Sequence, residues 1–440
     1  MFLNARTTAV RPRYLPGPGV KSIVTAGDAA AAYSRPVDLT MGCKVNRRGV
    51  AMMSSAHMVD DLYQGVVPAM LPFFVSERHY SYAAVAGLTL AATMLSSVVQ
   101  PAFGVWSDRK PRRWLVPAGM TLAALGVGAA GLFPGYAVTW VMVAISGIGI
   151  AAFHPSAASA ARRASGDSNR GMSVFALGGN VGFALGTLMA TPVLLWLGLR
   201  GTALLVLPAL VMASILVKWL RPVLDGPADA PHPSSMPSGR DNWPEFLKLT
   251  SVVVVRSIVF FGLSSFLALY FIHGLGASEV VGGAALTVFL ASGAVGTLLG
   301  GWLADRFGPL ISIRYGFAFC IPAMVGLVLA PEWHVAFVFV ALTGLGVFVP
   351  FSVFVILGQN YLPNRVGTAS GVTVGLAVTV GGLFNPVLGT LADRTSLHFA
   401  LVVLIALPAV ALLLSAFLRD PAAAGRPSTQ LSDPAAQPDG

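Results

Sequence analysis

The chain has 440 residues, of which 55% are hydrophobic and only 10% are charged. Soluble domains usually contain about 25% charged residues, so this composition excludes an ordinary water-soluble protein and indicates that lipid surrounds most of the chain. The formal net charge of +10 could suggest a nucleic-acid-binding protein, but the Lys and Arg residues form short clusters between apolar segments, so we expect no nucleic-acid partner.

Apolar segments of about 20 residues, the length that a helix needs to cross a bilayer, follow one another along the chain. The sequence therefore predicts an all-α membrane protein with twelve transmembrane helices in two pseudo-symmetric six-helix halves. The helices are expected near 50–75, 82–104, 114–133, 137–161, 171–196, 201–220, 247–272, 280–303, 312–330, 335–357, 367–391 and 397–418.

Polar segments separate the two halves and form both ends of the chain. Residues 221–246 are rich in Pro, Ser and Gly, a composition typical of a linker. The predicted halves are therefore 50–220 and 247–419. The tails, 1–49 and 420–440, are expected to be disordered and cytoplasmic, because the first has no apolar core of the kind that a secretory signal requires.

Lys and Arg residues predict the orientation of the helices. If the amino terminus is inside, the tails, the linker and the connectors on that side contain nearly all of them, including the cluster at 109–113. The connectors on the opposite side contain only Arg78, Arg200 and Arg394. Because positive residues are retained on the cytoplasmic side, we expect a multi-pass protein of the inner (plasma) membrane with both termini in the cytoplasm.

Short motifs recur in the two halves. The stretch GVWSDR at 104–109 returns as GWLADR at 301–306, and GIG at 147–149 returns as GLG at 344–346 with the same separation. Repeats at a fixed separation indicate that the halves are duplicates of one another, a common design among secondary transporters.

The connector GVWSDRKPRR, 104–113, combines one acid with four bases. The bases alone could serve only to set topology, but this does not explain Asp108 or the preceding glycine. Glycine lets helices approach closely, and an acid at a helix end can pair with bases in one conformation and lose them in another, as a gate requires. The predicted gating residues of the two copies are Gly104, Asp108, Arg109, Arg112, Arg113, Gly301, Asp305 and Arg306.

The pattern Gly-x-x-x-Asp-Arg-x-x-Arg-Arg at 104–113 resembles the loop signature of the major facilitator superfamily. Longer segments resemble its fosmidomycin resistance efflux family, which implies the major facilitator fold and proton-coupled drug export. Two positions depart from that family: Ser156 replaces a Glu that usually follows the His-Pro pair, and Asp60 replaces an Asn. The segments that carry the narrower resemblance are 57–73, 98–111, 151–166, 173–186 and 362–371.

Asp60 and Asp61 are the only acids well inside a predicted helix. A charge at the bilayer centre costs about 2.5–3.5 kcal/mol on insertion scales, so such residues are functional candidates. His57 precedes them by three and four residues and can neighbour either. We expect at least one Asp to exchange protons during transport, with Asp61 preferred because it matches the family position; the alternative is that both are permanently paired.

Arg256 is the only base well inside a predicted helix, and in the repeat it occupies nearly the place of Asp60. Two interpretations remain open. Arg256 could form a structural ion pair with Asp60 or Asp61, or its guanidinium could bind the oxygen atoms of an anionic substrate in the cavity.

Other polar residues inside the predicted helices are weaker candidates. His154 precedes Pro155, which frees a backbone carbonyl, and the resemblance favours a role for it in proton coupling over a structural one. Asn180 and Asn385 could contact substrate or only join helices. The remaining candidates for substrate binding are His57, Tyr63, Gln64, Gln100 and Tyr270.

The sequence is therefore interpreted as a proton-coupled transporter that exports a small anionic or polar drug by alternating access. We expect it to function as a monomer, with protons, lipid and a small molecule as its partners. A permease for another organic anion is the alternative. A membrane-embedded enzyme or a sensor is disfavoured, because no zinc-protease, nucleophile-elbow or Walker motif and no folded signalling domain is evident, so no metal or other cofactor is expected.

Overall fold

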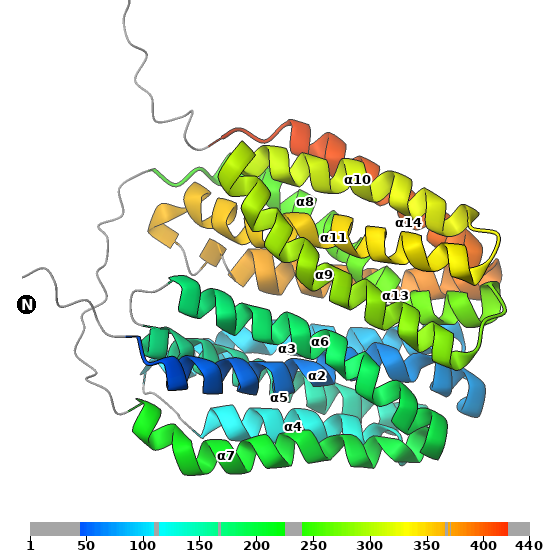
Figure 1. Cartoon of the computed structure of the whole chain (residues 1–440), viewed down its shortest axis with the longest axis horizontal. Coiled ribbons are helices and arrows are strands. Elements are labelled where there is room, and N and C mark those ends of the chain that lie inside the picture. Colours follow the sequence, from blue (N-terminus) through cyan, green and yellow to red (C-terminus); the bar gives the residue numbers. More distant parts are fainter. Residues whose placement is uncertain are drawn as a thin grey trace, which may run out of the picture. The chain divides into compact units, whose positions relative to one another are not determined.

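The structure is a computed structural model that describes residues 45–109, 114–165, 169–224, 240–365, 368–369 and 371–420, all within one unit, 44–440. These residues form twelve α-helices and no strand (Figure 1). The helices are α2 (Arg47–Arg78), α3 (Tyr82–Arg109), α4 (Leu115–Ala130), α5 (Tyr136–Ser165), α6 (Asn169–Leu197), α7 (Leu207–Leu224), α8 (Trp243–Leu269), α9 (Glu279–Phe307), α10 (Pro309–Leu329), α11 (Trp333–Tyr361), α13 (Ala377–Arg394) and α14 (Leu397–Ala416).

The helices form because their sequences are apolar and because lipid cannot satisfy free backbone groups, which leaves helices as the favoured spanning structure. Eight segments are long and apolar enough to cross a membrane, and one of them runs from Gly171 to Trp219 through both α6 and α7. Several helices begin at a polar cap whose side chain accepts a backbone N–H, namely Asn46, Asn242, Ser278 and Ser396. The predicted all-α class is confirmed.

Two predicted helices differ from the structure near their first residues. The segment expected at 201–220 begins as a 3-10 helix, Gly198–Val206, because Gly198 turns the chain at a φ of 60° and the Glu77 carboxylate accepts the N–H of Leu199. The segment expected at 367–391 includes a π-helix, Gly371–Leu376, before α13. Glycine is a poor helix former, which is consistent with irregular turns at this glycine-rich stretch.

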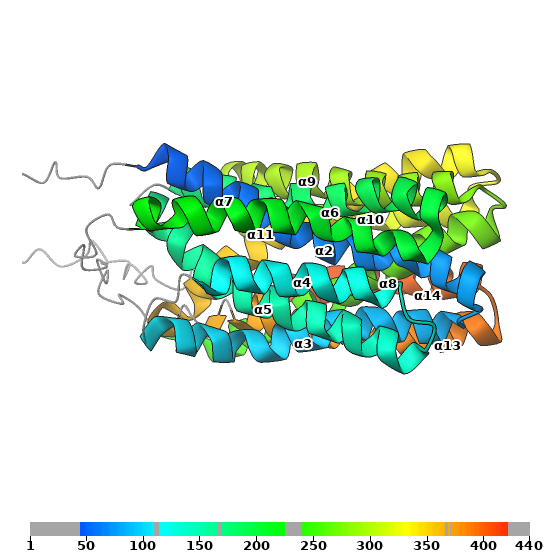
Figure 2. The ribbon, with the colours of Figure 1, turned by 90° about the horizontal axis from the view of Figure 1, so that it is seen from below.

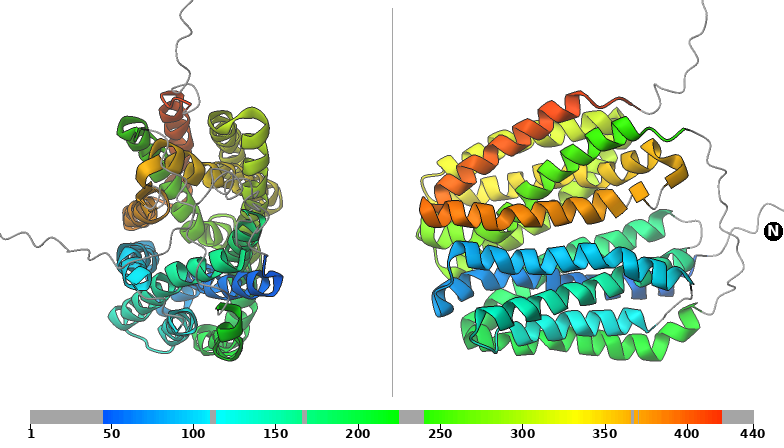
Figure 3. Two further views of the ribbon diagram at one scale, coloured as in Figure 1. Left: turned by 90° about the vertical axis from the view of Figure 1, so that its left-hand side faces the viewer. Right: turned by 180° about the vertical axis from the view of Figure 1, so that it is seen from behind.

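The two predicted halves occupy two sides of the helical bundle, with α2 to α7 on one side and α8 to α14 on the other (Figures 1 and 3). Within the halves, α2 packs on α6 and α4 on α5, while α9 and α10 pack on α11. Between the halves, α3 packs along α13 and α6 along α9, and Figure 2 shows α3 and α13 close together when seen from below.

Three sets of hydrogen bonds join the halves. The carboxylate of Asp393, at the end of α13, accepts the backbone N–H groups of Tyr82 (2.8 Å) and Ala83 (2.9 Å) at the start of α3. The hydroxyls of Thr187 and Thr287 lie 2.7 Å apart between α6 and α9. In the interior, a third set runs from Asn385 of α13 to Ser265 of α8 and on to Thr89 of α3.

Candidate functional site

Four ionisable side chains meet inside the first half. His57, Asp60 and Asp61 come from one turn of α2, and His154 comes from α5, which packs beside it. Gly179 of α6 makes room for this cluster, because a Cβ at that position would overlap the carboxylate of Asp61 and the ring of His57. The structure thus brings together the three residues that the sequence predicted for proton coupling and adds His57 to them.

Asp61 is the centre of the cluster. Its Oδ2 lies 3.2 Å from His57 Nε2, and its Oδ1 lies 3.2 Å from His154 Nε2. The two Nε2 atoms are themselves 3.3 Å apart. The side chains of Asp61 and His57 are only 12% and 10% exposed, so water contributes little to their solvation.

Backbone contacts fix the tautomers of both histidines. His57 Nδ1 lies 2.8 Å from the carbonyl of Phe175, and His154 Nδ1 lies 2.9 Å from that of Ile150. A carbonyl oxygen only accepts hydrogen bonds, so each Nδ1 must carry a proton. In the neutral ring, Nε2 is then unprotonated and presents a lone pair. Two lone pairs and a carboxylate then face one another, so the cluster needs a bound cation to satisfy them. A proton between Asp61 and one Nε2 atom would satisfy one of these contacts, and the atoms are also close enough together for a metal ion.

Asp60 lies deeper than Asp61 and is fully buried. Neither of its oxygen atoms has a hydrogen-bond partner. His154 Nδ1 lies 3.6 Å from its Oδ2. Burying a carboxylate without hydrogen bonds costs folding free energy. Asp60 therefore adds a second carboxyl to the cluster but does not stabilise the fold.

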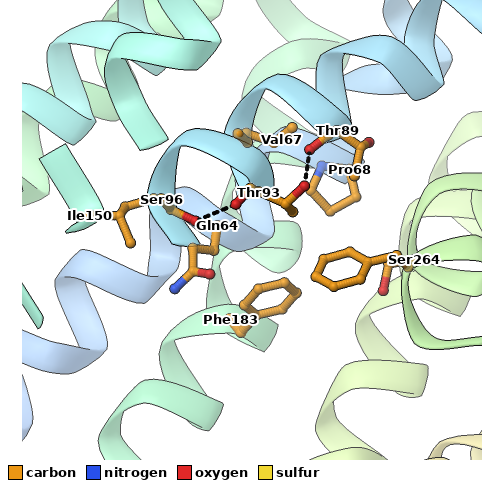
Figure 4. A pocket seen from close by; sticks show the side chains of 11 residues that line it. Gln64, Val67, Pro68, Thr89, Thr93, Ser96, Ile150, Phe183 and Ser264 are labelled. Carbon is orange, nitrogen blue, oxygen red and sulfur yellow. Dashed lines mark hydrogen bonds between the residues drawn. The ribbon is translucent and has the colours of Figure 1, made fainter. Parts of the chain in front are cut away.

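A pocket lies next to the cluster, between the two halves. It is lined mainly by α2, α3 and α6 of the first half and by α8 of the second (Figure 4). Gln64 connects it to the cluster, because its side chain lines the pocket and its Nε2 donates a hydrogen bond to Asp61 Oδ1. The lining residues are Gln64, Val67, Pro68, Thr89, Ala92, Thr93, Ser96, Ile150, Phe183, Phe261 and Ser264.

Arg256 is buried in the second half, with only 5% of its surface exposed. Its Nε donates to the carbonyl of Val347 at 3.0 Å, and its guanidinium lies about 5 Å from the rings of Phe260, Phe348 and Phe351. Its Nη2 has no partner. No ion pair joins Arg256 to Asp60 or Asp61 among the described residues, so this conformation does not contain the structural ion pair that was one of the two interpretations.

Several weaker candidates have structural roles instead. The hydroxyl of Tyr63 donates to Leu205 and accepts from Ala209, which ties α2 to the backbone near α7. Tyr270 lies at the end of α8, 3.4 Å from His398. Neither tyrosine is among the residues that line the pocket, and substrate binding by either stays a prediction.

The three predicted amide residues other than Gln64 also lie outside the pocket lining. Asn385 is fully buried and joins α13 to Ser265, which favours the interhelical interpretation over substrate contact. Asn180 and Gln100 are half-buried on α6 and α3, and substrate contact by either stays a prediction.

The predicted gating residues lie at the ends of α3 and α9. Close helix packing does not explain the glycines, because a Cβ at Gly104 or Gly301 would meet nothing within 4 Å. This part of the expectation is wrong for the present conformation. Asp305 and Arg306 are exposed, and the Arg306 guanidinium lies over the ring of Trp302. The side chains of Asp108 and Arg109, and residues Arg112 and Arg113, lie outside what the structure describes.

Comparison with known proteins identifies the family. Residues 53–386 match the model of the Major Facilitator Superfamily. The chain belongs to this superfamily. Its proteins are transporters rather than enzymes, bind small-molecule substrates and work as monomers, so this member is a multi-pass membrane transporter.

Two relatives span nearly the same length. The uncharacterized MFS-type transporter YfnC of Bacillus subtilis is 30% identical over 374 residues, covering 81% of this chain and 89% of YfnC. The fosmidomycin resistance protein of Escherichia coli is 28% identical over 379 residues, covering 84% of this chain and 92% of that protein. The resemblance predicted from the motifs is thereby confirmed.

Solved structures show the same fold. A bacterial homologue of the human lysosomal transporter Spinster, in an inward-facing and occupied conformation, superposes with a TM-score of 0.70 at 17% identity, covering 83% of this chain and 95% of that one. The nucleoside transporter NupG (D323A mutant) gives a TM-score of 0.67 at 12% identity, covering 84% of this chain and all of that one. The predicted major facilitator fold is confirmed.

Sequence reasoning missed most of the pocket lining, although a signal was present. Thr89, Thr93 and Ser96 are separated by four and three residues in an apolar helix, and this spacing places them on one face. Similarly, Phe260 follows Arg256 by four residues, the spacing that lets an aromatic ring and a guanidinium meet.

Proposed function

We propose that the chain is a proton-coupled antiporter that exports a small anionic or polar compound, of the kind represented by fosmidomycin. The observation that carries this proposal is the cluster of Asp61, His57 and His154, whose facing atoms are all acceptors and need a proton. Gln64 connects this cluster to the pocket, so proton binding and substrate binding can influence one another.

Arg256 lies outside the pocket lining, but its chemistry supports an anionic substrate. Its guanidinium is buried and only partly hydrogen-bonded, and intramembrane charges without a partner are typical of ligand sites. The name of the Escherichia coli relative supports a drug of the phosphonate class. The Lys and Arg distribution supports inner-membrane insertion with both termini in the cytoplasm, so export would run from the end of the bundle that contains the basic connectors.

Drug susceptibility tests this proposal in cells. A host that lacks its own efflux pumps is compared with and without this chain across phosphonates and unrelated drugs. We expect protection against fosmidomycin that disappears when a protonophore collapses the proton gradient. Faster killing on expression would mean that the protein imports the drug, and the proposal would then be wrong.

The gating motif gives a second prediction. Asp108→Asn should nearly abolish transport while leaving expression and substrate binding largely intact, because a charge that pairs in only one state acts on the conformational equilibrium. The measurement compares transport rate with substrate affinity in the purified variant. Transport at the wild-type rate would show that the motif only sets topology.

Asp393 is expected to hold the transporter closed at the end of the bundle opposite the gating motif. Its carboxylate caps the first turn of α3 from the other half, and such a cap contributes about 1 kcal/mol, or roughly a fivefold change in population. Asp393→Ala should therefore speed the labelling of Thr93→Cys by a membrane-impermeant thiol reagent added outside cells, in a background with Cys43→Ser and Cys320→Ala.

A matched control removes a cap that lies within one half. Ser396 caps α14 by accepting the N–H of Phe399, so Ser396→Ala weakens a helix start near the same end without touching the other half. We expect this variant to label at the rate of its parent. Equal labelling of the Asp393 and Ser396 variants would show that Asp393 does not control opening.

A further inference from the structure

Three side chains with metal-binding atoms meet inside the first half. Within the described residues, one ring nitrogen each of His57 and His154 and one oxygen of Asp61 lie within 4.8 Å of one another. The two Nε2 atoms are 3.3 Å apart, and each lies 3.2 Å from an oxygen of Asp61. The residues come from α2 and α5 of the same half, so the group does not depend on how the two halves meet.

The separations between these atoms match a tetrahedral metal ion. Zinc binds imidazole nitrogen at about 2.0–2.1 Å and carboxylate oxygen at about 2.0–2.2 Å. Two such bonds at the tetrahedral angle place neighbouring ligand atoms roughly 3.3–3.5 Å apart. The observed distances of 3.2 and 3.3 Å are therefore close to the edges of a zinc coordination tetrahedron.

The histidines are held in the way that metal ligands are held. Nδ1 of His57 lies 2.8 Å from the carbonyl of Phe175, and Nδ1 of His154 lies 2.9 Å from the carbonyl of Ile150. In metal sites such a partner on the second ring nitrogen fixes the tautomer and the orientation of the ring. Each Nε2 is therefore left with the lone pair that a metal ion requires.

A divalent cation satisfies the cluster more completely than a single proton does. A proton between Asp61 and one Nε2 leaves the other Nε2 facing acceptor atoms, whereas an ion accepts lone pairs from all three residues. Asp60 adds a second carboxyl that is fully buried and has no hydrogen bond on either oxygen. Two carboxylates together carry the charge that one divalent cation balances.

We infer that His57, Asp61 and His154 form a binding site for a divalent transition metal ion, with Zn²⁺ as the expected ligand. Two imidazoles and one carboxylate suit zinc and its neighbours. Mg²⁺ and Ca²⁺ prefer six or more oxygen ligands, and Cu(I) prefers sulfur, so this set of donors disfavours all three.

Occupancy of this site has a consequence for transport. An ion bonded to all three residues takes the lone pairs that the proton of the proposed function would use, so the ion and that proton exclude one another. Zn²⁺ should therefore inhibit proton-driven export. This consequence rests on the proposed function, whereas the metal site itself does not.

Metal binding to the purified protein without an affinity tag tests the site. Cys43→Ser and Cys320→Ala first remove both thiols of the chain. Added Co²⁺ should give the intense visible absorption of a four-coordinate ion, and Zn²⁺ should displace it. Zn²⁺ should also raise the melting temperature, because it binds the folded protein. No bound metal, or the weak spectrum of six-coordinate Co²⁺, would overturn the inference.

Two variants assign the binding to this cluster. Asp61→Asn and His154→Gln should each remove the Co²⁺ absorption and weaken Zn²⁺ binding by at least about 10- to 100-fold, the loss typical even for a residue that only supports a ligand. Their melting temperatures without metal show whether they fold, and either folded variant decides the question. Unchanged Zn²⁺ affinity in a folded variant would overturn the inference.

His334→Gln is the matched control. His334 lies 3.7 Å from the carboxylate of Glu332, and both side chains are exposed. This pair belongs to no group of three possible ligands among the described residues. The control should bind Zn²⁺ as its parent does. A loss as large as that of His154→Gln would show that zinc binds adventitiously at surface histidines, and the inference would be wrong.

Transport in liposomes separates this inference from the proposed function. Proton-driven uptake of fosmidomycin should fall as Zn²⁺ occupies the site, over the concentrations that displace Co²⁺, and a chelator should restore it. Transport that continues with the site saturated would overturn the exclusion of ion and proton. A protein that binds Zn²⁺ but does not transport fosmidomycin would contradict the proposed function and support the metal site.

Discussion

Asp61→Asn is expected to abolish proton-driven accumulation of substrate while leaving downhill exchange. The amide has the size of the protonated acid but cannot release a proton, so both conformations remain accessible and the gradient no longer drives the cycle. The contacts of Asp61 with His57 Nε2 and His154 Nε2, both at 3.2 Å, place it at the centre of the proposed proton site. The measurement is substrate accumulation in vesicles with and without a pH gradient.

Asp60→Asn is the matched control, because it makes the same change in the adjacent residue. Asp60 is fully buried and has no hydrogen bond on either oxygen, so removing its charge should cost little stability, and the resembling family usually has Asn there. We expect this variant to retain most of its proton-driven transport. An inactive Asp60→Asn together with an active Asp61→Asn would reverse the two assignments.

Arg256→Met should reduce the affinity for anionic substrates by about 10- to 100-fold, the range expected for losing hydrogen bonds to a charged group. The melting temperature should not fall, because the guanidinium is buried, has an unpartnered Nη2 and has no acid to neutralise in this conformation. Arg256→Lys should fold normally but bind anions weakly, because an ammonium group keeps the positive charge but lacks the paired N–H donors of a guanidinium.

Arg314→Met provides the control for Arg256. Arg314 is half-buried in α10 and donates to the carbonyls of Ser415 and Ala416, so its loss removes arginine hydrogen bonds at a site with no proposed role in substrate binding. Anion affinity should remain unchanged in this variant. If Arg256→Met lowers the melting temperature by several degrees and the added change Asp61→Asn restores it, Arg256 would be the structural partner of that acid in another conformation.

The helices were predictable because lipid imposes a strong constraint on sequence: each span must be apolar and must satisfy its own backbone. The irregular turns at Gly198 and Gly371 could not be predicted, because this constraint acts on composition and does not determine the type of turn at a glycine. The spacing of His57 and Asp61 predicted their contact within α2. The approach of His154 depends on how α5 packs against α2, which no local pattern encodes.

Helical periodicity also explains which site predictions went wrong. Gln64 follows Asp61 by three residues and shares its face, whereas Tyr63 follows by two and points to another side of α2, where it contacts Leu205 and Ala209. The sequence left the pairing of Arg256 with an acid open as one of two interpretations. In the folded chain, aromatic rings from α8 and α11 surround the guanidinium instead, an arrangement that symmetry between the halves does not predict.

Transport by the purified protein in liposomes tests proton-coupled export most directly. Vesicles with an acidic lumen are diluted into mildly alkaline buffer that contains labelled fosmidomycin, so that outward proton flow can drive uptake. We predict accumulation above the equilibrium level, its loss on adding a protonophore, and its absence in Asp61→Asn. Uptake that ignores the pH gradient, or that increases when the acidic side is outside, would contradict proton-coupled export.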